Sequence, residues 1–324
     1  MAPRKKSKGS IYDVAKASGV SIGTVSRVFN EKRDVAEATR KLVLEAAKKV
    51  NYMPRISTRR VNIGLIVEEL EKANEVGYVS DIVSTLAKHM ALGGGVLELV
   101  SLQDLDAVYR NYMRGVIAVV FAKDLKKFAA LRHVPLILIN NVIEGPNYHY
   151  VASDHAQGVR LAAEHLLGRG HRKIGFLEVV KDTWASRQRQ RGFREAFEKL
   201  DVKLPGNLMR FCENRPARDA VIPLLEAKPT ALIVCGEDLS LEVSKLLIHD
   251  FKVEIPKDLS LVTFETPIVS SLLSPPQTTV AQPWEEIGRQ AVEGIIGLVE
   301  GKRTKPLRVL LPNRLIERGS VRSL

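Results

Sequence analysis

The spacing of hydrophobic residues divides the chain into a short N-terminal part and a long remainder. Apolar residues recur at helical spacing in three stretches, residues 11–18, 21–29 and 36–50. From residue 62 onward, short runs of β-branched and aliphatic residues alternate with amphipathic stretches. The pattern therefore predicts three short helices followed by a long series of alternating strands and helices.

The first two helical stretches are joined by residues that favour a tight turn. Ser10 followed by Asp13 predicts a capping box at the start of the first helix, with Asp in place of the usual Glu. Gly19 predicts a turn with positive φ at its end, and Ser21 is the expected N-cap of the second helix. Two helices joined by a glycine turn and braced by a third make a helix-turn-helix.

The second helix is expected to expose small, polar and cationic residues, namely Ile22, Gly23, Ser26, Arg27 and Asn30. A helix of this kind fits the major groove of DNA, with its N-terminal residues at the base edges. Arg27 is the candidate for contacting a guanine, and the hydroxyls of Ser21, Thr24 and Ser26 are candidates for phosphates or bases. A small structural bundle remains the alternative for this pattern taken alone.

Net charge is concentrated at the same end of the chain. The 324 residues carry a formal charge of +12, and residues 1–60 hold 15 Lys and Arg against 5 Asp and Glu. The remaining residues are nearly balanced, with 34 against 32. A charge confined to one end is typical of a module that binds a polyanion. A solvated basic tail would account for residues 3–8, but not for Arg27, Arg40 or Lys48 within the helical stretches.

The remainder of the chain predicts parallel, doubly wound sheets. Strands are expected at residues 62–67, 96–100, 115–121, 136–140, 173–177, 231–234 and 259–264, with helices between them at residues such as 81–90, 158–167 and 239–249. Apolar strands separated by helices are typical of sheets covered on both faces. The length is comfortable for two sheets, which would hold a ligand between the carboxyl ends of their strands.

Other protein classes are poorly supported by the sequence. Its longest apolar run near a strand, residues 116–122, is too short to span a bilayer, and the basic N-terminus lacks the apolar core of a signal peptide. Two cysteines make neither a disulfide framework nor a zinc site. The glycines at 93–95 lack the Gly-Lys-Ser/Thr of a phosphate loop, and no hydrolase or metalloprotease motif occurs. We expect a cytoplasmic protein that is not an enzyme and holds no metal or cofactor.

A set of motifs in the N-terminal part carries a family resemblance. They are Tyr12-Asp13-Val14-Ala15, Gly19-Val20-Ser21, Thr24-Val25-Ser26-Arg27-Val28, Asn30, Thr39-Arg40 and Asn51-Tyr52-Met53-Pro54. This segment resembles the DNA-binding segment of the lactose/galactose repressor family. The resemblance implies an operator-binding head and linker over residues 1–60, with Ile22, Gly23 and Arg27 selecting the DNA sequence. It also places Tyr12, Asn30, Tyr52 and Arg55 among the expected DNA contacts.

The linker departs from the family pattern. In that family, a hinge helix follows the tyrosine-x-proline motif and inserts a leucine into the minor groove. Here only residues 55–60 precede the first expected strand, and no leucine stands among them. We therefore expect weaker kinking of the operator centre. Two alternatives stay open for Arg55, Arg59 and Arg60, which either contact phosphates or form a solvated linker.

The resemblance continues to the end of the chain through a second set of motifs. They are Val151-x-x-Asp154, Gly158, Glu164-His165-Leu166, Gly170-His171-Arg172-Lys173-Ile174, Arg189-x-x-Gly192-Phe193, Pro256-x-Asp258, Thr278-Thr279-Val280, Gln282-Pro283, Gly288, Pro312 and Arg318. They imply a two-lobed α/β body over residues 61–324 that is similar to periplasmic binding proteins. The lobe nearer the DNA would comprise residues 62–156 and 284–314. The distal lobe would comprise residues 158–282 and 315–324, with crossings near residues 157, 283 and 315.

Candidate effector-binding residues follow from the chemistry of a sugar or nucleoside and from the matching positions. Hydroxyls need carboxylates and an Arg fork, and a flat apolar face needs an aromatic platform. The candidates are Tyr78, Asp154, Trp184, Arg189, Asp238, Glu265 and Gln282. A helix cap is the alternative for Asp154, and a core aromatic is the alternative for Trp184. Glu237-Asp238 and Thr263-Phe264-Glu265 replace the usual family residues and change the reach and charge of the site.

Together these features predict a homodimeric, effector-responsive transcription repressor that binds palindromic operator DNA. Two alternatives remain open at this stage. One is a solute-binding protein whose basic head is a nonspecific DNA tether. The other is a constitutive DNA-binding protein whose effector site is vestigial.

Overall fold

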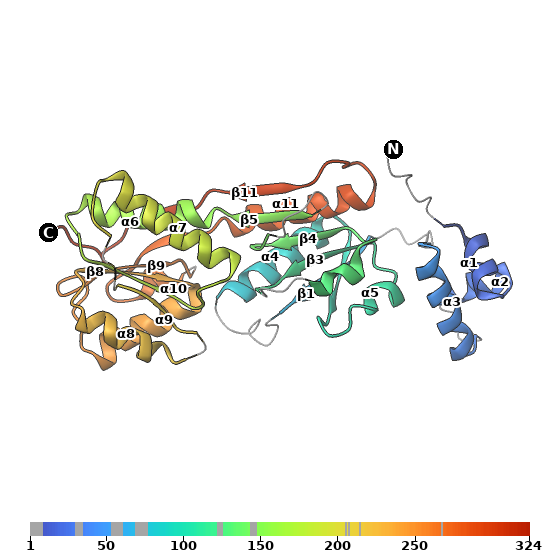
Figure 1. Cartoon of the computed structure of the whole chain (residues 1–324), viewed down its shortest axis with the longest axis horizontal. Coiled ribbons are helices and arrows are strands. Elements are labelled where there is room, and N and C mark those ends of the chain that lie inside the picture. The colour runs from blue at the N-terminus through green and yellow to red at the C-terminus, as the bar shows by residue number, and fades with distance from the viewer. Residues whose placement is uncertain are drawn as a thin grey trace.

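The structure is a computed structural model, and it describes residues 9–29, 35–52, 61–68, 77–121, 126–142, 148–204, 206, 208–213, 215–266 and 268–324. Three bodies follow one another along the long axis of the molecule (Figure 1). A small helical head lies at one end, a first α/β lobe in the middle and a second α/β lobe at the other end. We call these the head, the near lobe and the distal lobe.

The head is built from α1 Ile11–Ser18, α2 Ile22–Phe29 and α3 Glu37–Lys49. The predicted capping box is present, because the Asp13 backbone N–H donates to Ser10 Oγ and the Ser10 backbone N–H donates to Asp13 Oδ2. Gly19 has a φ of 70°, the left-handed conformation expected at the turn. The three helices bury Val14, Val25, Val28, Phe29, Val43, Ala46 and Ala47 in one small core. Leu42, which shares their helical periodicity, is instead 47% exposed.

The near lobe is a parallel six-stranded sheet with helices on both faces, in the strand order β11-β5-β4-β3-β1-β2. Its elements are β1 Asn62–Val67, α4 Tyr78–Leu92, β2 Val96–Val100, α5 Ala107–Arg110, β3 Gly115–Val119, η2 Lys126–Leu131, β4 Leu136–Ile139, β5 His149–Ser153, α11 Trp284–Val299 and β11 Arg308–Leu311.

The distal lobe repeats this plan in the strand order β12-β10-β9-β8-β6-β7, with only β12 antiparallel to its neighbour within the described sheet. Its elements are α6 His155–Gly168, β6 Ile174–Glu178, α7 Trp184–Lys199, β7 Met209–Phe211, α8 Ala217–Glu226, β8 Ala231–Cys235, α9 Glu237–Lys245, η3 Leu246–Asp250, β9 Ser260–Phe264, α10 Val269–Leu272, β10 Thr278–Ala281 and β12 Arg314–Ile316. The predicted fold class is confirmed.

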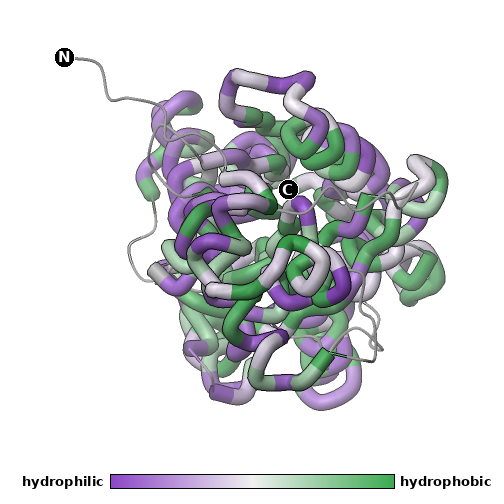
Figure 2. The backbone as a smooth tube through the Cα atoms, turned by 90° about the vertical axis from the view of Figure 1, so that its right-hand side faces the viewer, coloured by the Kyte–Doolittle hydropathy of each residue, from purple (hydrophilic) through white to green (hydrophobic). Residues whose placement is uncertain are grey.

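Alternate residues of each strand supply two separate cores. In β3, Ile117 and Val119 pack under α4 and α11, whereas Val116 and Ala118 pack against α5 and η2. Because successive side chains point to opposite faces, a strand covered on both sides must be apolar throughout. In the end-on view of Figure 2, hydrophobic and hydrophilic stretches alternate along the coils of the helices. This distribution is expected for helices with one face on a sheet.

The apolar runs do not predict strands β5, β7, β10, β11 and β12. These strands are short and several contain polar residues, so their sequences alone resemble loops. Pairing with a neighbouring strand makes these segments strands: β11 joins its sheet through β5, and β12 joins its sheet through β10. The chain passes between the two sheets three times, after β5, after β10 and after β11. The carboxyl ends of both sheets therefore lie at these crossings.

Candidate functional site

Helix α2 presents one face of the head to solvent. Its N-terminus is capped by Ser21, whose Oγ accepts a hydrogen bond from the Thr24 backbone N–H at 3.1 Å. Val25, Val28 and Phe29 are buried, and this fixes the opposite face, with Ile22, Gly23 and Arg27, on the outside. A Cβ added at Gly23 would meet only Ser21 Oγ, at 3.7 Å. Packing therefore does not require glycine at this position.

The other predicted DNA-binding residues lie in different surroundings. Tyr12, near the start of α1, is 69% exposed, and Ser26 is half-buried on α2. Tyr52 packs its ring on Phe29 at 5.5 Å and so belongs partly to the core of the head. Asn30 and Arg55 lie outside the described residues.

The head is attached to the near lobe by contacts that the sequence does not predict. Phe29 contacts the ring of Tyr112, with 5.3 Å between the ring centroids. Lys48 Nζ lies 2.6 Å from Asp106 Oδ1 and 5.0 Å from the ring centroid of Tyr109. The head therefore rests on the corner of the near lobe formed by α5 and the residues around it (Figure 1).

Between the lobes, a buried ion pair joins a strand end to a helix of the distal lobe. Glu178 is the last residue of β6, and Arg189 lies on α7. Arg189 Nη1 donates to both carboxylate oxygens of Glu178, at 3.0 and 3.2 Å, and its guanidinium lies 4.6 Å from the ring centroid of Phe264. Burial raises the pKa of Glu178, while Arg189 opposes this rise. Glu178 is a site residue that the sequence analysis missed.

Gln282 connects the two lobes at the second crossing. Its Nε2 donates to Glu237 Oε1 at 2.7 Å, and its Oε1 accepts from Asn140 Nδ2 at 3.2 Å. Asn140 follows β4 with a φ of 49°, a strained backbone conformation for a residue with a side chain, and its Oδ1 accepts from the Ser153 backbone N–H. Burial raises the pKa of Glu237 to about 7. Two further residues therefore belong to this network: Glu237, which the sequence marks only as a departure from the family pattern, and Asn140, which no sequence motif marks.

Aromatic side chains and unpaired polar atoms lie beside this network. Tyr78 opens α4 and packs against Phe121 and Trp284, and His155 lies edge-on to Trp184 with 5.6 Å between the rings. Both nitrogens of His155 are buried without a hydrogen-bond partner among the residues that the structure describes. Burial holds the pKa of His155 well below its usual value and raises that of Tyr78. Orphaned polar groups of this kind mark a place for a ligand or water.

The first turn of α4 touches α9 of the distal lobe. A Cβ added at Gly77 would overlap the Asp238 carboxylate, so the two lobes are in direct contact here. Burial and then the charge of Asp238 raise the pKa of Asp81. Asp81 Oδ2 is another buried atom with no hydrogen-bond partner in the described part of the chain. This edge of the site is therefore acidic.

Two predicted effector residues have structural roles. Asp154 caps α6, since its Oδ1 accepts from the Gln157 backbone N–H at 3.0 Å, as the alternative for this residue anticipated. Glu265 is not in the interlobe network, because its carboxylate binds both Nη atoms of Arg318 and the hydroxyl of Thr279. Glu265 comes directly after Phe264, the last residue of β9, and Arg318 and Thr279 hold its carboxylate on the side of β10 and the C-terminal segment.

The structure thus brings Tyr78, Asp238 and Gln282 to the contact between the lobes, and the charge of Arg189 acts on Tyr78 across it. Trp184 packs on His155, the first residue after the first crossing. The arrangement offers hydrogen-bond donors, acceptors and aromatic rings, which suit recognition of a small polar molecule. Within the described ranges, no three His, Cys, Asp or Glu side chains are grouped as metal ligands. Both cysteines are buried, and burial raises their pKa, to about 11 for Cys212.

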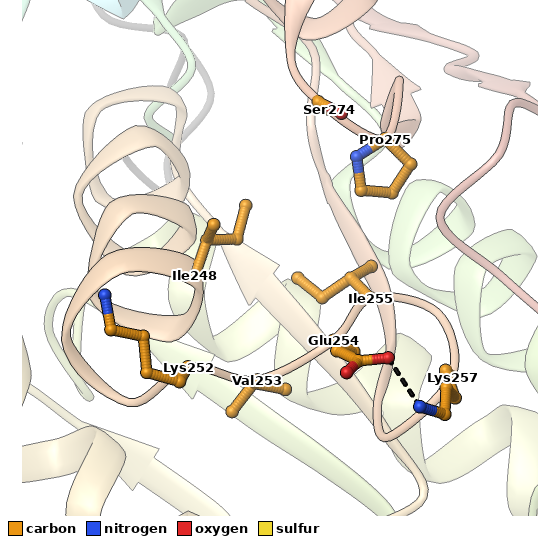
Figure 3. Close-up of a pocket in the computed structure, with 8 residues that line it drawn as sticks. All are labelled: Ile248, Lys252, Val253, Glu254, Ile255, Lys257, Ser274 and Pro275. Carbon is orange, nitrogen blue, oxygen red and sulfur yellow. Dashed lines mark hydrogen bonds and ion pairs between the residues drawn. The ribbon is translucent and has the colours of Figure 1, made fainter.

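A separate open groove of about 460 Å³ lies on the distal lobe (Figure 3). Ile248, Val253, Ile255 and Pro275 supply apolar walls, and Lys257 binds Glu254 at 2.7 Å across its rim. None of the predicted site residues lines this groove. In the described part of the chain, no helix combines the length and the apolar character that crossing a bilayer requires.

Comparison with known families and proteins agrees with this architecture. Residues 10–55 match the family described as bacterial regulatory proteins, lacI family, and residues 163–321 match a periplasmic binding protein-like domain. A transcriptional repressor called PurR from Haemophilus influenzae is 29% identical over 97% of this chain and 99% of its own length. The ribose operon repressor of Halalkalibacterium halodurans is 28% identical, with 97% of each chain covered.

Solved structures give the same result. A complex of the transcriptional regulator CelR with cellobiose superposes with a TM-score of 0.73 at 25% identity, over 97% of this chain and all of that one. A lac repressor dimer bound to operator and the anti-inducer ONPF shares the fold, with a TM-score of 0.69 at 24% identity over 98% of this chain and 100% of the other. The chain thus joins a helix-turn-helix head that matches the lacI family of bacterial regulatory proteins to a two-lobed α/β body that matches a periplasmic binding protein-like domain.

Proposed function

We propose that this protein is a homodimeric transcription repressor that binds operator DNA through α2 and responds to a small molecule between its lobes. The observation that carries the proposal is the exposed face of α2, with Gly23 and Arg27, on a capped and packed head. Arg27 pairs with a guanine, and Gly23 allows the helix backbone to approach the base pairs closely. Because it acts on chromosomal DNA, we place the protein in the cytoplasm.

The effector is a small polar metabolite with hydroxyl or amide groups. Gln282, Asn140 and Glu237 offer hydrogen bonds from both lobes, and Tyr78 and Trp184 offer aromatic surface. These groups lie where the chain crosses between the sheets, so a ligand that binds them changes the angle between the lobes. Such a ligand couples to the head with about 1–3 kcal/mol, the usual range for linked sites. The curated relatives include a ribose operon repressor, and one structural neighbour is a cellobiose complex, which favours a sugar.

Exposed apolar side chains on both lobes support a dimer. In the near lobe, Leu99 on the edge strand β2 is 55% exposed, and Leu92, the last residue of α4, is 75% exposed. In the distal lobe, Ile268 is 73% and Leu272 is 76% exposed beside α10. Exposed apolar patches and bare sheet edges favour association, and a two-fold dimer matches a palindromic site. The variant Leu99→Glu/Leu272→Glu should therefore sediment as a monomer.

A second function is favoured by one observation. Glu178 already occupies the Nη1 donor of Arg189, which a ligand hydroxyl would otherwise use. A protein whose own carboxylate fills the site could bind DNA constitutively, without an effector.

The deciding experiment is selection of bound sequences from random duplexes by the full chain, repeated with sugars and nucleosides. We expect a palindromic operator, and an affinity for it that one of the ligands changes. Arg27→Glu should abolish the preference and Lys203→Glu on the distal lobe should not, with an unchanged circular dichroism spectrum in both. An absence of sequence preference refutes the repressor. A preference that no ligand changes favours constitutive binding.

A further inference from the structure

The edge of the near lobe that faces the head is rich in exposed cations. In a parallel sheet all strands begin at the same edge, and β1 begins at Asn62, directly after the segment that joins the head. The loop between α11 and β11 lies at this same end, on the side of the near lobe nearest the head (Figure 1). Residues 300–308 contain Lys302, Arg303, Lys305 and Arg308, all exposed, and Glu300 is their one carboxylate.

Contacts and charges place these cations in one region with Arg114, which precedes β3. Arg114 Nη2 donates to the Val299 carbonyl oxygen at 3.3 Å. Glu300 is offset by Lys302, which lies 2.7 Å away, and Lys302 and then Arg114 lower the pKa of its carboxyl. After burial, Arg303 and Arg308 lower the pKa of His149 at the start of β5. Arg114 and the loop between α11 and β11 therefore carry a local positive potential, whereas Asp104 and Asp106 at the α5 corner are paired with Arg110 and Lys48.

That potential is not a general property of the body. Beyond residue 60 the chain holds 34 Lys and Arg against 32 Asp and Glu, so its charge is nearly balanced. Excess cations at the head-facing edge must be offset by acidic surface elsewhere, such as the interlobe contact with Asp81 and Asp238. The uneven distribution orients the body electrostatically, with its positive edge on the same side as the basic head.

The head itself is held against this end. Lys48 binds Asp106, and Phe29 packs on Tyr112, both next to α5. A duplex that joins the two heads of a dimer, with half-sites about 34 Å apart, runs past the head-facing ends of both near lobes. Its phosphates follow one another about every 1.7 Å along the axis, so they meet any cation that projects toward them.

We propose that the head-facing edge of the near lobe is a second DNA-binding surface, on which Arg114 and the cations of residues 302–308 contact the phosphate backbone. The proposal rests on the repressor function and extends it, because the body then contributes to DNA affinity directly. These contacts carry no base information, so they strengthen binding without changing the operator sequence. The effector then changes DNA affinity through this edge as well as through the heads, because lobe movement changes the distance between the edge and the duplex.

The test compares the salt dependence of operator binding in full-length variants. Arg303→Gln/Lys305→Gln removes two exposed cations from the loop, and Lys199→Gln/Lys203→Gln removes the same charge from the distal lobe as a control. Each phosphate contact contributes about 0.9 to the slope of log affinity against log salt. We expect the loop variant to lower that slope by roughly 1–2 and the control to leave it unchanged, with equal melting temperatures. Hydroxyl-radical protection should shrink at the flanks of the site only in the loop variant.

The two proposals fail separately. If the wild-type protein selects an operator and the loop variant keeps both the slope and the footprint, the second surface is refuted while the repressor stands. If the loop variant and the distal control lower the slope of log affinity against log salt by the same amount, the effect is long-range electrostatics and the contact is again refuted. If the wild-type protein shows no sequence preference, the repressor fails whatever the slope.

Discussion

The buried pair of Glu178 and Arg189 allows a sharp test of how the interlobe site is held together. Glu178 is 2% and Arg189 is 9% exposed, so neither charge is well solvated. Removing one member of a buried pair costs about 3–5 kcal/mol, because the other charge is left without compensation. We therefore expect Arg189→Met to lower the free energy of unfolding by about 4 kcal/mol at neutral pH.

The two single variants should differ in a direction that the structure fixes. Glu178 is compensated by Arg189 and by one backbone N–H, whereas Arg189 also feels the charge of Glu237. Glu178→Gln should therefore cost less than Arg189→Met, about 1–3 kcal/mol. The double variant Glu178→Gln/Arg189→Met should be more stable than the sum of the single losses predicts, since contacting residues couple by about 0.5–3 kcal/mol.

The pH dependence supplies an independent check on the same variant. Without Arg189, the folded-state pKa of Glu178 rises further above its unfolded value. Stability is then greatest at low pH, where the carboxyl is protonated, and is lost as the pH rises through the raised pKa. Arg189→Met should therefore lower the free energy of unfolding less at about pH 5 than at about pH 8.

Urea unfolding at both pH values, followed by tryptophan fluorescence and circular dichroism, would measure these costs. Agreement of the two probes tests whether the transition is two-state in this chain of several bodies. Arg218→Met is the matched control, because its pair with Asp250 is 50% and 38% exposed and should contribute less than about 1 kcal/mol. A loss for Arg189→Met no larger than that of the control would refute the reasoning, as would a larger loss for Glu178→Gln.

Three further predictions concern the site, the head and their connection. The pKa of Glu237 is raised from 4.5 to about 7, so the folded state binds its proton more tightly and the free energy of unfolding falls by about 3 kcal/mol as the pH rises through that window. In Glu237→Gln, the urea midpoint of unfolding should therefore change less between roughly pH 5 and 8 than in the wild type, and an equal change would contradict this. Gly23→Ala, whose Cβ enters open space, should stabilise the head by about 0.5–1 kcal/mol in thermal unfolding yet weaken operator binding, whereas unchanged affinity would remove the close-approach role of Gly23. Tyr112→Ala removes the ring on which Phe29 packs, so cleavage between head and near lobe in limited proteolysis should quicken roughly two- to tenfold, and an unaltered rate would show that this contact does not hold the head.

Local sequence determined much of the head and of the strands. The capping box at Ser10, the turn at Gly19 and the N-cap at Ser21 each depend on residues within four positions of one another, so the chain specifies them without its fold. Strand β1 likewise has the predicted bounds, because a continuous apolar run needs cover on both faces wherever it lies, and the edge strand β2 also begins and ends where predicted. These features predicted the helical head and the parallel doubly wound sheets, and the family resemblance supplied the two-lobed arrangement.

Tertiary structure decided the chemistry between the lobes. Glu178 is the last residue of β6 and Glu237 follows the neighbouring strand β8, and only the strand order places both carboxylates beside Arg189. Glu265 stands at a position that the family resemblance assigns to the effector site, yet its carboxylate binds Arg318. Neither outcome is encoded in local spacing. A sequence fixes which side chains alternate along a strand, whereas the order of strands and the packing of the two lobes fix which of those side chains meet.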